Sequence, residues 1–289
     1  MSRLRIVHET IYTYKRPVRF GPHRIILRPR EGHDVRVEEM RLDISPEFEL
    51  EWSRDLFGNS IATARFLNSS DHLQIRSEVF LDQTPSFPLP STRPSTLVPF
   101  PVQFSELESE IAAAYQATIF PRDVGQVKEW LRSAVDLTAL RGAEDVVAAV
   151  ARAIRSTIQY RRREAKGVQA PATTLGEQSG SCRDMATLML EALRALGLPA
   201  RFASGYLDCL ATEAGRGAMH AWSEAYLPEI GWLGYDPTLG EATSLKHVLT
   251  GVSNHPQGVM PVSGTFLDEK EAYLEMKVTV LTERLPAGV

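Results

Sequence analysis

Alternating apolar and polar residues dominate the first 83 residues and predict β-strands. The clearest runs cover residues 4–12 and 35–44, and the second run contains a shift of phase. Its apolar positions are Val35, Val37, Met40, Leu42 and Ile44. Turn-forming residues such as Phe57-Gly58-Asn59 separate the runs. Short strands at this spacing predict a β-sandwich-like N-terminal domain over residues 1–83.

A proline-rich segment follows at residues 84–103, with six prolines. Proline removes a backbone donor and restricts φ, so a helix or a central strand cannot run through this segment. We interpret it as an extended linker over the surface. A ligand for a proline-recognising domain is the less favoured alternative.

Apolar residues then recur at helical spacing, which predicts that residues 104–289 form a mixed domain. Ser105 caps a first predicted helix, a second begins near Asp123, and a third begins near Ala143. Three arginines at 161–163 lie near the predicted C-terminal end of the third helix, and we interpret them as its solvated basic end. Residues 276–280 predict a final strand, but the pattern leaves open which sheet receives it.

Composition narrows the function classes. The chain has 289 residues, 43% apolar and 24% charged, with a net charge of −4. These values indicate a globular protein and do not favour binding of nucleic acid or an anionic membrane. There is neither a long apolar run nor an apolar signal-peptide core, so we expect a cytoplasmic location. Two cysteines, Cys182 and Cys209, are too few for a disulfide scaffold and suit a reducing compartment.

Cys182 stands at a predicted helix N-terminus. Ser181 and Asp184 have the spacing of a capping box, and helical apolar spacing continues to Leu196 before Gly197 and a proline end the helix. Unpaired N–H groups and the positive end of the helix dipole stabilise a thiolate at this place. The same N–H groups can stabilise an oxyanion. A small buried cysteine without chemistry is the alternative reading.

His220 and Asp236 fall on a predicted hairpin. Residues 219–226 and 232–236 alternate as strands, with a turn between them. If Leu227 lies opposite Gly231, Asp236 lies opposite Trp222 and diagonal to His220 on one face, about 7–8 Å away. A one-residue slip would place the two side chains on opposite faces.

A thiol, an imidazole and a carboxylate match the roles of nucleophile, base and orienting group. A structural histidine and an aspartate in an Asp-Pro turn are the alternative readings. A zinc site is disfavoured, because paired-cysteine and His-x₃-His spacings are both missing. We assign no role to His247 or His255, and we expect Cys209 to be structural.

The sequence resembles the bacterial transglutaminase-like superfamily. The motifs that carry the resemblance are residues 180–184, 195–201, 204–206, 220–228 and 231–238, together with 54–59 in the associated N-terminal β-rich region. Members commonly have asparagine where this chain has Leu239, and often a Gly-Arg-Asp-Tyr-like segment where it has Val252-Ser253-Asn254-His255.

The resemblance implies an α+β protein, with a papain-like core whose helix carries the cysteine and whose antiparallel sheet carries His220 and Asp236. It implies that Cys182, His220 and Asp236 are the catalytic residues and that no metal or organic cofactor is needed. Gln178 is a candidate oxyanion-hole side chain by position. The expected partner is a peptide or protein substrate, with hydrolysis favoured over transamidation. A noncatalytic binding protein on the same fold remains an alternative.

Overall fold

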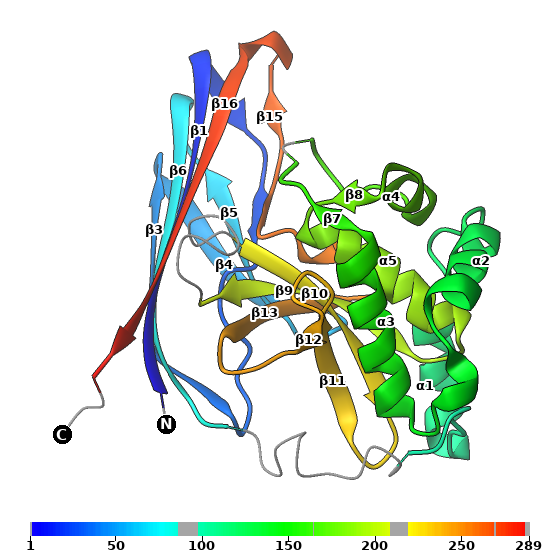
Figure 1. Cartoon of the computed structure of the whole chain (residues 1–289). Coiled ribbons are helices and arrows are strands. Elements are labelled where there is room, and N and C mark those ends of the chain that lie inside the picture. The colour runs from blue at the N-terminus through cyan, green and yellow to red at the C-terminus, as the bar shows by residue number, and fades with distance from the viewer. Residues whose placement is uncertain (1, 86–97, 164, 209–218, 269, 287–289) are drawn as a thin grey trace.

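We describe a computed structural model of residues 2–85, 98–163, 165–208, 219–268 and 270–286 (Figure 1). Two packed β-sheets form one part of the described chain, and a third sheet with helices packed against it forms the other. This is the α+β architecture that the sequence predicted. Most of the predicted proline-rich linker, and Cys209, lie outside the described residues.

The N-terminal region is built from two antiparallel sheets, as the alternation predicted. Tyr14, Phe20 and Ile25 belong to the apolar cluster between them. The first sheet contains β1 (Ser2–Phe20), β3 (Val35–Ser45), β6 (Ser70–Gln83), β15 (Phe266–Leu267) and β16 (Tyr273–Leu285). The second contains β2 (His23–Ile25), β4 (Phe48–Arg54), β5 (Ser60–Phe66) and β14 (Val262–Ser263).

Two details of these strands match the sequence pattern. Leu4, Ile6, His8 and Thr10 of β1 are buried while the residues between them are partly exposed. The phase shift in the second run corresponds to a register irregularity between Val37 and Glu39, where β3 pairs with β6.

The final strand, whose sheet the sequence left open, pairs with β1. The register of β16 runs from Arg3 opposite Leu285 to Tyr14 opposite Tyr273. The two strands lie side by side in Figure 1, where red meets blue. The N-terminal sheet is therefore made from strands at both ends of the described chain.

The second part of the chain packs helices against a five-stranded antiparallel sheet with the order β12-β11-β10-β9-β13. The larger helices are α1 (Glu106–Gln116), α2 (Val124–Ala134), α3 (Ala143–Thr157), α4 (Pro171–Glu177) and α5 (Cys182–Ala195). The strands are β9 (Ala200–Leu207), β10 (Met219–Leu227), β11 (Gly231–Asp236), β12 (Glu241–Ala242) and β13 (His247–Ser253). A short pair of strands, β7 (Gln159–Tyr160) and β8 (Ser179–Gly180), also occurs in this part. The described residues further contain 3₁₀ turns at Leu137–Ala139, Pro256–Val259 and Lys270–Ala272.

Helix α5 is the central element of this part. Every residue from Asp184 to Arg194 is buried, because the sheet covers one side and α2, α3 and α4 contact the helix as well. A helix enclosed in this way has little freedom to shift, so the residue at its N-terminus is held in place.

Glycine at position 205 allows close packing beside the hairpin. Gly205 lies opposite His220 on β10 and opposite Leu249 on β13. A Cβ atom here would lie 2.8 Å from Cη2 of Trp222 and would also meet the carbonyl oxygen of Val248. The absence of a side chain at Gly205 therefore allows Trp222 and the Val248 backbone to pack closely against β9.

We expect Gly205→Ala to lower the free energy of unfolding by about 1–3 kcal/mol, because the extra methyl group overpacks the sheet. Urea denaturation measures the change. Gly125→Ala is the matched control: Gly125 is exposed in α2, and an added methyl group there would have no neighbouring atom within 4 Å, so alanine should stabilise slightly. Equal stabilities for the Gly205 variant and the wild type would contradict the close packing.

Candidate active site

Cys182 is the first residue of α5, as predicted, and Ser181 is the N-cap. A capping box joins Ser181 and Asp184. The carboxylate of Asp184 accepts hydrogen bonds from the backbone N–H of Ser181 at 2.9 Å and from its hydroxyl at 2.7 Å. Cys182 is free and partly buried. Its side chain therefore stands on a fixed helix terminus where backbone N–H groups are unpaired within the helix.

Asp184 connects this helix start to the preceding loop. Its side chain is fully buried and pairs with Arg163 at 2.9 Å. The backbone N–H of Gln169 donates to the same carboxylate at 2.7 Å. Burial alone would raise the pKa of Asp184, but Arg163 and the other donors hold the pKa below its usual value.

The interpretation of residues 161–163 as a solvated helix end was therefore wrong for Arg163. Helix α3 ends at Thr157, before the arginines, and Arg163 reaches α5. The sequence pattern could not reveal this pair, because the partner lies 21 residues away in a different element.

The hairpin has the predicted register. Leu227 pairs with Gly231 and Ser223 pairs with Tyr235. This pairing brings Asp236, at the end of β11, next to His220 on β10. Nε2 of His220 lies 2.7 Å from Oδ2 of Asp236, and both side chains are buried. The structure thus brings together these two residues as the register argument predicted.

Cys182 also contributes to the electrostatic surroundings of His220. Burial alone would lower the pKa of His220, but the charges of Asp236 and Cys182 and hydrogen bonds to both raise it to about 10. The pKa of Asp236 is held well below its usual range, because both histidine contacts outweigh the effect of burial. The raised pKa keeps the His220 ring protonated at neutral pH, as an imidazolium beside the Asp236 carboxylate.

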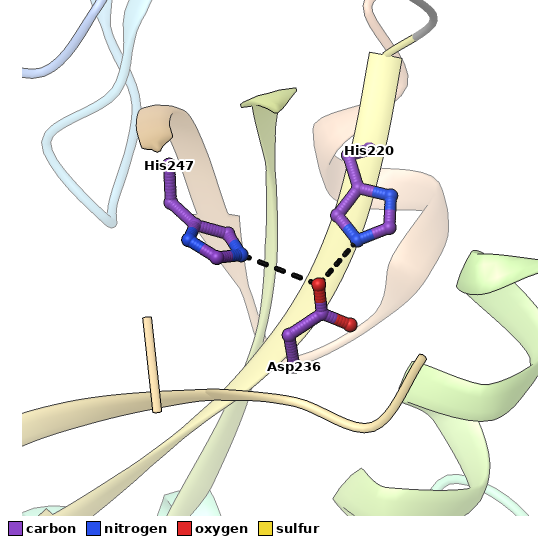
Figure 2. A group of neighbouring side chains, drawn as sticks. All are labelled: His220, Asp236 and His247. Atoms are coloured by element: carbon purple, nitrogen blue, oxygen red, sulfur yellow. Dashed lines mark hydrogen bonds and ion pairs between the residues drawn. The ribbon is translucent and has the colours of Figure 1, made fainter. Parts of the chain in front are cut away.

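A third residue, His247, joins this cluster. Figure 2 shows the rings of His220 and His247 pointing at one oxygen of Asp236. Nε2 of His247 lies 3.2 Å from that oxygen, Oδ2. Sequence reasoning assigned His247 no role. The sequence around His247 resembles a loop after the hairpin. It gives no indication that β13 pairs with β9 and brings the His247 ring to Asp236.

These three side chains could also be considered as metal ligands, because their nitrogen and oxygen atoms lie within 4.8 Å of one another. Two of the nitrogens, however, contact the carboxylate oxygen at hydrogen-bond distance. A metal would have to displace these contacts, so the donor set fits a hydrogen-bonded cluster better than a metal centre.

Trp222 packs against both histidines. Its ring centroid is 5.3 Å from that of His247 and 6.5 Å from that of His220. Trp222 is 2% exposed, so the histidine–aspartate cluster has a buried, low-polarity neighbour. A low-polarity neighbour of this kind strengthens the electrostatic interactions beside it.

The remaining sequence candidates have different surroundings. Gln178 is exposed, has left-handed backbone geometry at the end of α4, and lines a crevice with residues 155–159. None of its described contacts involves Cys182, and its oxyanion-hole role remains a prediction. The side chain of His255 accepts a hydrogen bond from the Gln257 N–H, away from the cluster.

The structure and site define an α+β protein with a papain-like core that supports thiol-dependent amide chemistry. Comparison with known families agrees. Residues 4–82 match the bacterial transglutaminase-like N-terminal region, and residues 133–237 match the transglutaminase-like superfamily. The two ranges together cover more than half of the chain. The chain therefore belongs to the transglutaminase-like superfamily, as the sequence resemblance indicated.

Relatives and solved structures extend the comparison. An uncharacterized protein of Mycobacterium tuberculosis is 26% identical over 295 residues, which cover 96% of this chain and 92% of that protein. A protein-glutamine gamma-glutamyltransferase of Pseudomonas aeruginosa is 42% identical over 89 residues, 27% of this chain and 13% of that enzyme. A candidate cysteine protease from Cytophaga hutchinsonii superimposes with a TM-score of 0.74 at 15% identity. The superposition covers 100% of this chain and 92% of the protease chain. The two proteins therefore share a fold.

No helix among the described residues is both long and apolar enough to cross a membrane. The cytoplasmic location expected from the sequence remains a prediction.

We expect Asp184→Asn to lower the free energy of unfolding by about 3 kcal/mol, because it breaks a buried ion pair and places an amide among donors. Urea denaturation at pH 7 measures the loss. Asp71→Asn, a change at an exposed carboxylate, is the control and should shift stability by less than about 0.5 kcal/mol. A loss no larger than that of the control would show that Asp184 does not stabilise the helix start.

The raised pKa of His220 also predicts a pH dependence of stability. A histidine titrates near pH 6.5 in an unfolded chain and near pH 10 here, so the folded state binds more protons between these values. The stabilisation is complete below about pH 6.5 and is lost as the pH rises toward 10. Urea denaturation at several pH values should therefore give a steeper decline for the wild type than for His220→Gln. The exposed His72→Gln variant should follow the wild type; parallel curves for all three proteins would contradict the raised pKa.

Proposed function

We propose that this protein is a thiol-dependent acyltransfer enzyme acting on amide bonds of a peptide or protein, with Cys182, His220 and Asp236 as its catalytic triad. The observation that carries the proposal is the hydrogen bond between the buried ring of His220 and Asp236. The nearby Cys182 contributes to the raised pKa of the same ring. Cys182 at a helix N-terminus supports the role of nucleophile.

In the acylation step, Sγ of Cys182 attacks the carbonyl carbon of the substrate amide. The carbonyl oxygen becomes an oxyanion, which N–H groups of the first turn of α5 can stabilise. His220 donates its proton to the amide nitrogen, the C–N bond breaks, and an amine leaves. A thioester on Cys182 remains. Asp236 keeps the imidazole oriented and stabilises its positive charge.

In the second step, His220 accepts a proton from the attacking group. Water gives a carboxylic acid, whereas a primary amine gives a new amide, and both release the Cys182 thiol. We favour hydrolysis, because transamidation requires an amine site and exclusion of water. Transamidation is the second candidate, supported by the local similarity to the glutamyltransferase of Pseudomonas aeruginosa.

A noncatalytic binding protein with this fold is the alternative from another class, since fold alone does not establish activity. It predicts a Cys182 with ordinary reactivity. The presence of all three side chains, with His220 and Asp236 hydrogen-bonded, favours an enzyme instead.

We expect iodoacetamide to alkylate Cys182 rapidly at pH 6–7, because the paired thiolate is the reactive form. The rate against pH is measured for the wild type and three variants by mass spectrometry. The fast reaction should vanish in Cys182→Ser, persist in Cys209→Ser, and slow at least tenfold in His220→Ala. Ordinary thiol reactivity at Cys182 in the wild type would favour the binding-protein alternative.

The fate of the acyl group is measured separately. Glutamine-containing and unmodified peptide pools are incubated with the enzyme, with and without a labelled primary amine. Free carboxylate products without amine incorporation support hydrolysis, and incorporation of the label supports transamidation. Cys182→Ser is the control for both products.

A further inference from the structure

The catalytic proposal uses one of the two histidines that contact Asp236. The second, His247, is on β13, and its side chain is 2% exposed. We propose that His247 is a positioning residue of this active site, and that the N-terminal region holds it in place through Asn59 and Gln83. The inference rests on the proposed function, because it assigns His247 to the orientation of a catalytic aspartate.

The orientation of the His247 ring follows from its two hydrogen bonds. Nδ1 lies 3.1 Å from the backbone nitrogen of Ser244 and accepts its N–H. A nitrogen that accepts a hydrogen bond carries no proton, so the neutral ring has its proton on Nε2. Nε2 then donates to Oδ2 of Asp236. The Ser244 contact therefore selects the tautomer that can support Asp236.

The carboxylate of Asp236 is held on both oxygens. Oδ2 accepts from His220 at 2.7 Å and from His247 at 3.2 Å. Oδ1 accepts from the backbone N–H of Thr238 at 2.8 Å. Three donors restrain rotation of the carboxylate and compensate its charge in a buried site. The Asp236 carboxylate that accepts the hydrogen bond of His220 is thus also held by His247 and Thr238.

The strand that carries His247 lies at the edge of the core sheet, where it pairs with β9 on one side. The N-terminal region provides contacts on β13 that the sheet does not. The side chain of Asn59 accepts from Val252 N–H at 2.9 Å and donates to the Val252 carbonyl oxygen at 2.8 Å. One amide side chain therefore bonds both backbone groups of this residue, as a neighbouring strand would.

Two further contacts reach β13 from the N-terminal region. The backbone N–H of Arg30 donates to the carbonyl oxygen of Leu249 at 2.7 Å. The side chain of Gln83, at the end of β6, donates to the carbonyl oxygen of His247 at 3.2 Å. The His247 backbone is thus directly connected to the N-terminal sheet.

Asn59 is itself fixed by its own loop, the motif at residues 54–59. Asp55 accepts from the backbone N–H of Asn59 at 2.9 Å and from its amide at 2.8 Å. Gly58 has a φ of 73°, which glycine adopts without strain, and permits the tight turn before Asn59. Arg30 donates to Oδ1 of Asn59 at 2.8 Å. This motif gives the N-terminal region a defined contact with the core.

The first experiment tests His247 by iodoacetamide alkylation of Cys182 against pH in the full chain. We expect His247→Ala to slow alkylation at pH 6–7 about tenfold and to change the pH profile, the effect of losing one hydrogen bond to a charged group. His247→Gln can place an amide N–H near the position of Nε2 and should recover most of the rate. His255→Ala is the histidine control and should match the wild type.

The outcomes separate the two proposals. An activated thiol that is unchanged in folded His247→Ala overturns the positioning role and leaves the proposed function intact. Equal losses in the alanine and glutamine variants, matched by equal losses of melting temperature, also overturn it, because the effect is then structural. If the wild type shows no activated thiol, the proposed function fails and the positioning role falls with it.

NMR of the histidine-labelled protein measures which ring nitrogen of His247 carries the proton, and this measurement does not depend on thiol reactivity. We expect His247 to show a protonated Nε2 and an unprotonated Nδ1 near neutral pH. The opposite tautomer would overturn the hydrogen bond to Asp236 even in an active enzyme.

The second experiment tests the contact from the N-terminal region. Asn59→Ala should speed amide hydrogen exchange in residues 247–252 and slow Cys182 alkylation several-fold, because β13 loses the two bonds at Val252. Asn68→Ala, in an exposed turn of the same region, is the matched control. Unchanged exchange and alkylation in a folded Asn59→Ala protein would refute the support of β13 by the N-terminal region.

Discussion

A buried carboxylate charge is the constraint around which this site is organised. Asp236 has no exposed surface, and an unpaired carboxylate there would cost far more free energy than a domain can supply. The chain meets this constraint with donors from three places, namely His220 on β10, His247 on β13 and the turn after β11. Three strands must therefore be in register before the charge is accommodated.

The N-terminus of α5, which carries Cys182, is also organised around a buried carboxylate. Asp184 is also fully buried, and its donors come from the N-cap, from the preceding loop and from Arg163. One buried carboxylate thus fixes the thiol side of the site and another fixes the imidazole side. Each buried carboxylate charge is compensated only when the segments that supply its donors are folded. The local geometry of the site therefore depends on the packing of the whole core.

Much of this arrangement could be predicted from local patterns. The capping box at Ser181 and Asp184 located Cys182 on the helix, and the hairpin register brought His220 to Asp236, because both depend on residues close in sequence. His247 and Arg163 were missed for the opposite reason. Their partners are defined by the return of β13 beside β9 and by a loop that packs on α5, and neither arrangement leaves a periodic signal in the sequence.

The pairing of β16 with β1 changes how the two parts of the chain should be viewed. A strand near residue 280 completes a sheet that begins near residue 3, so the helical core is topologically an insertion within the N-terminal fold. Contacts of such large sequence separation form at a high entropic cost of loop closure, and they form late if they follow the local elements. A ribosome must release nearly all of the described chain before that sheet can close. A fragment cut in the proline-rich segment would also separate β16 from its partner, and the two halves would have to associate to restore the sheet.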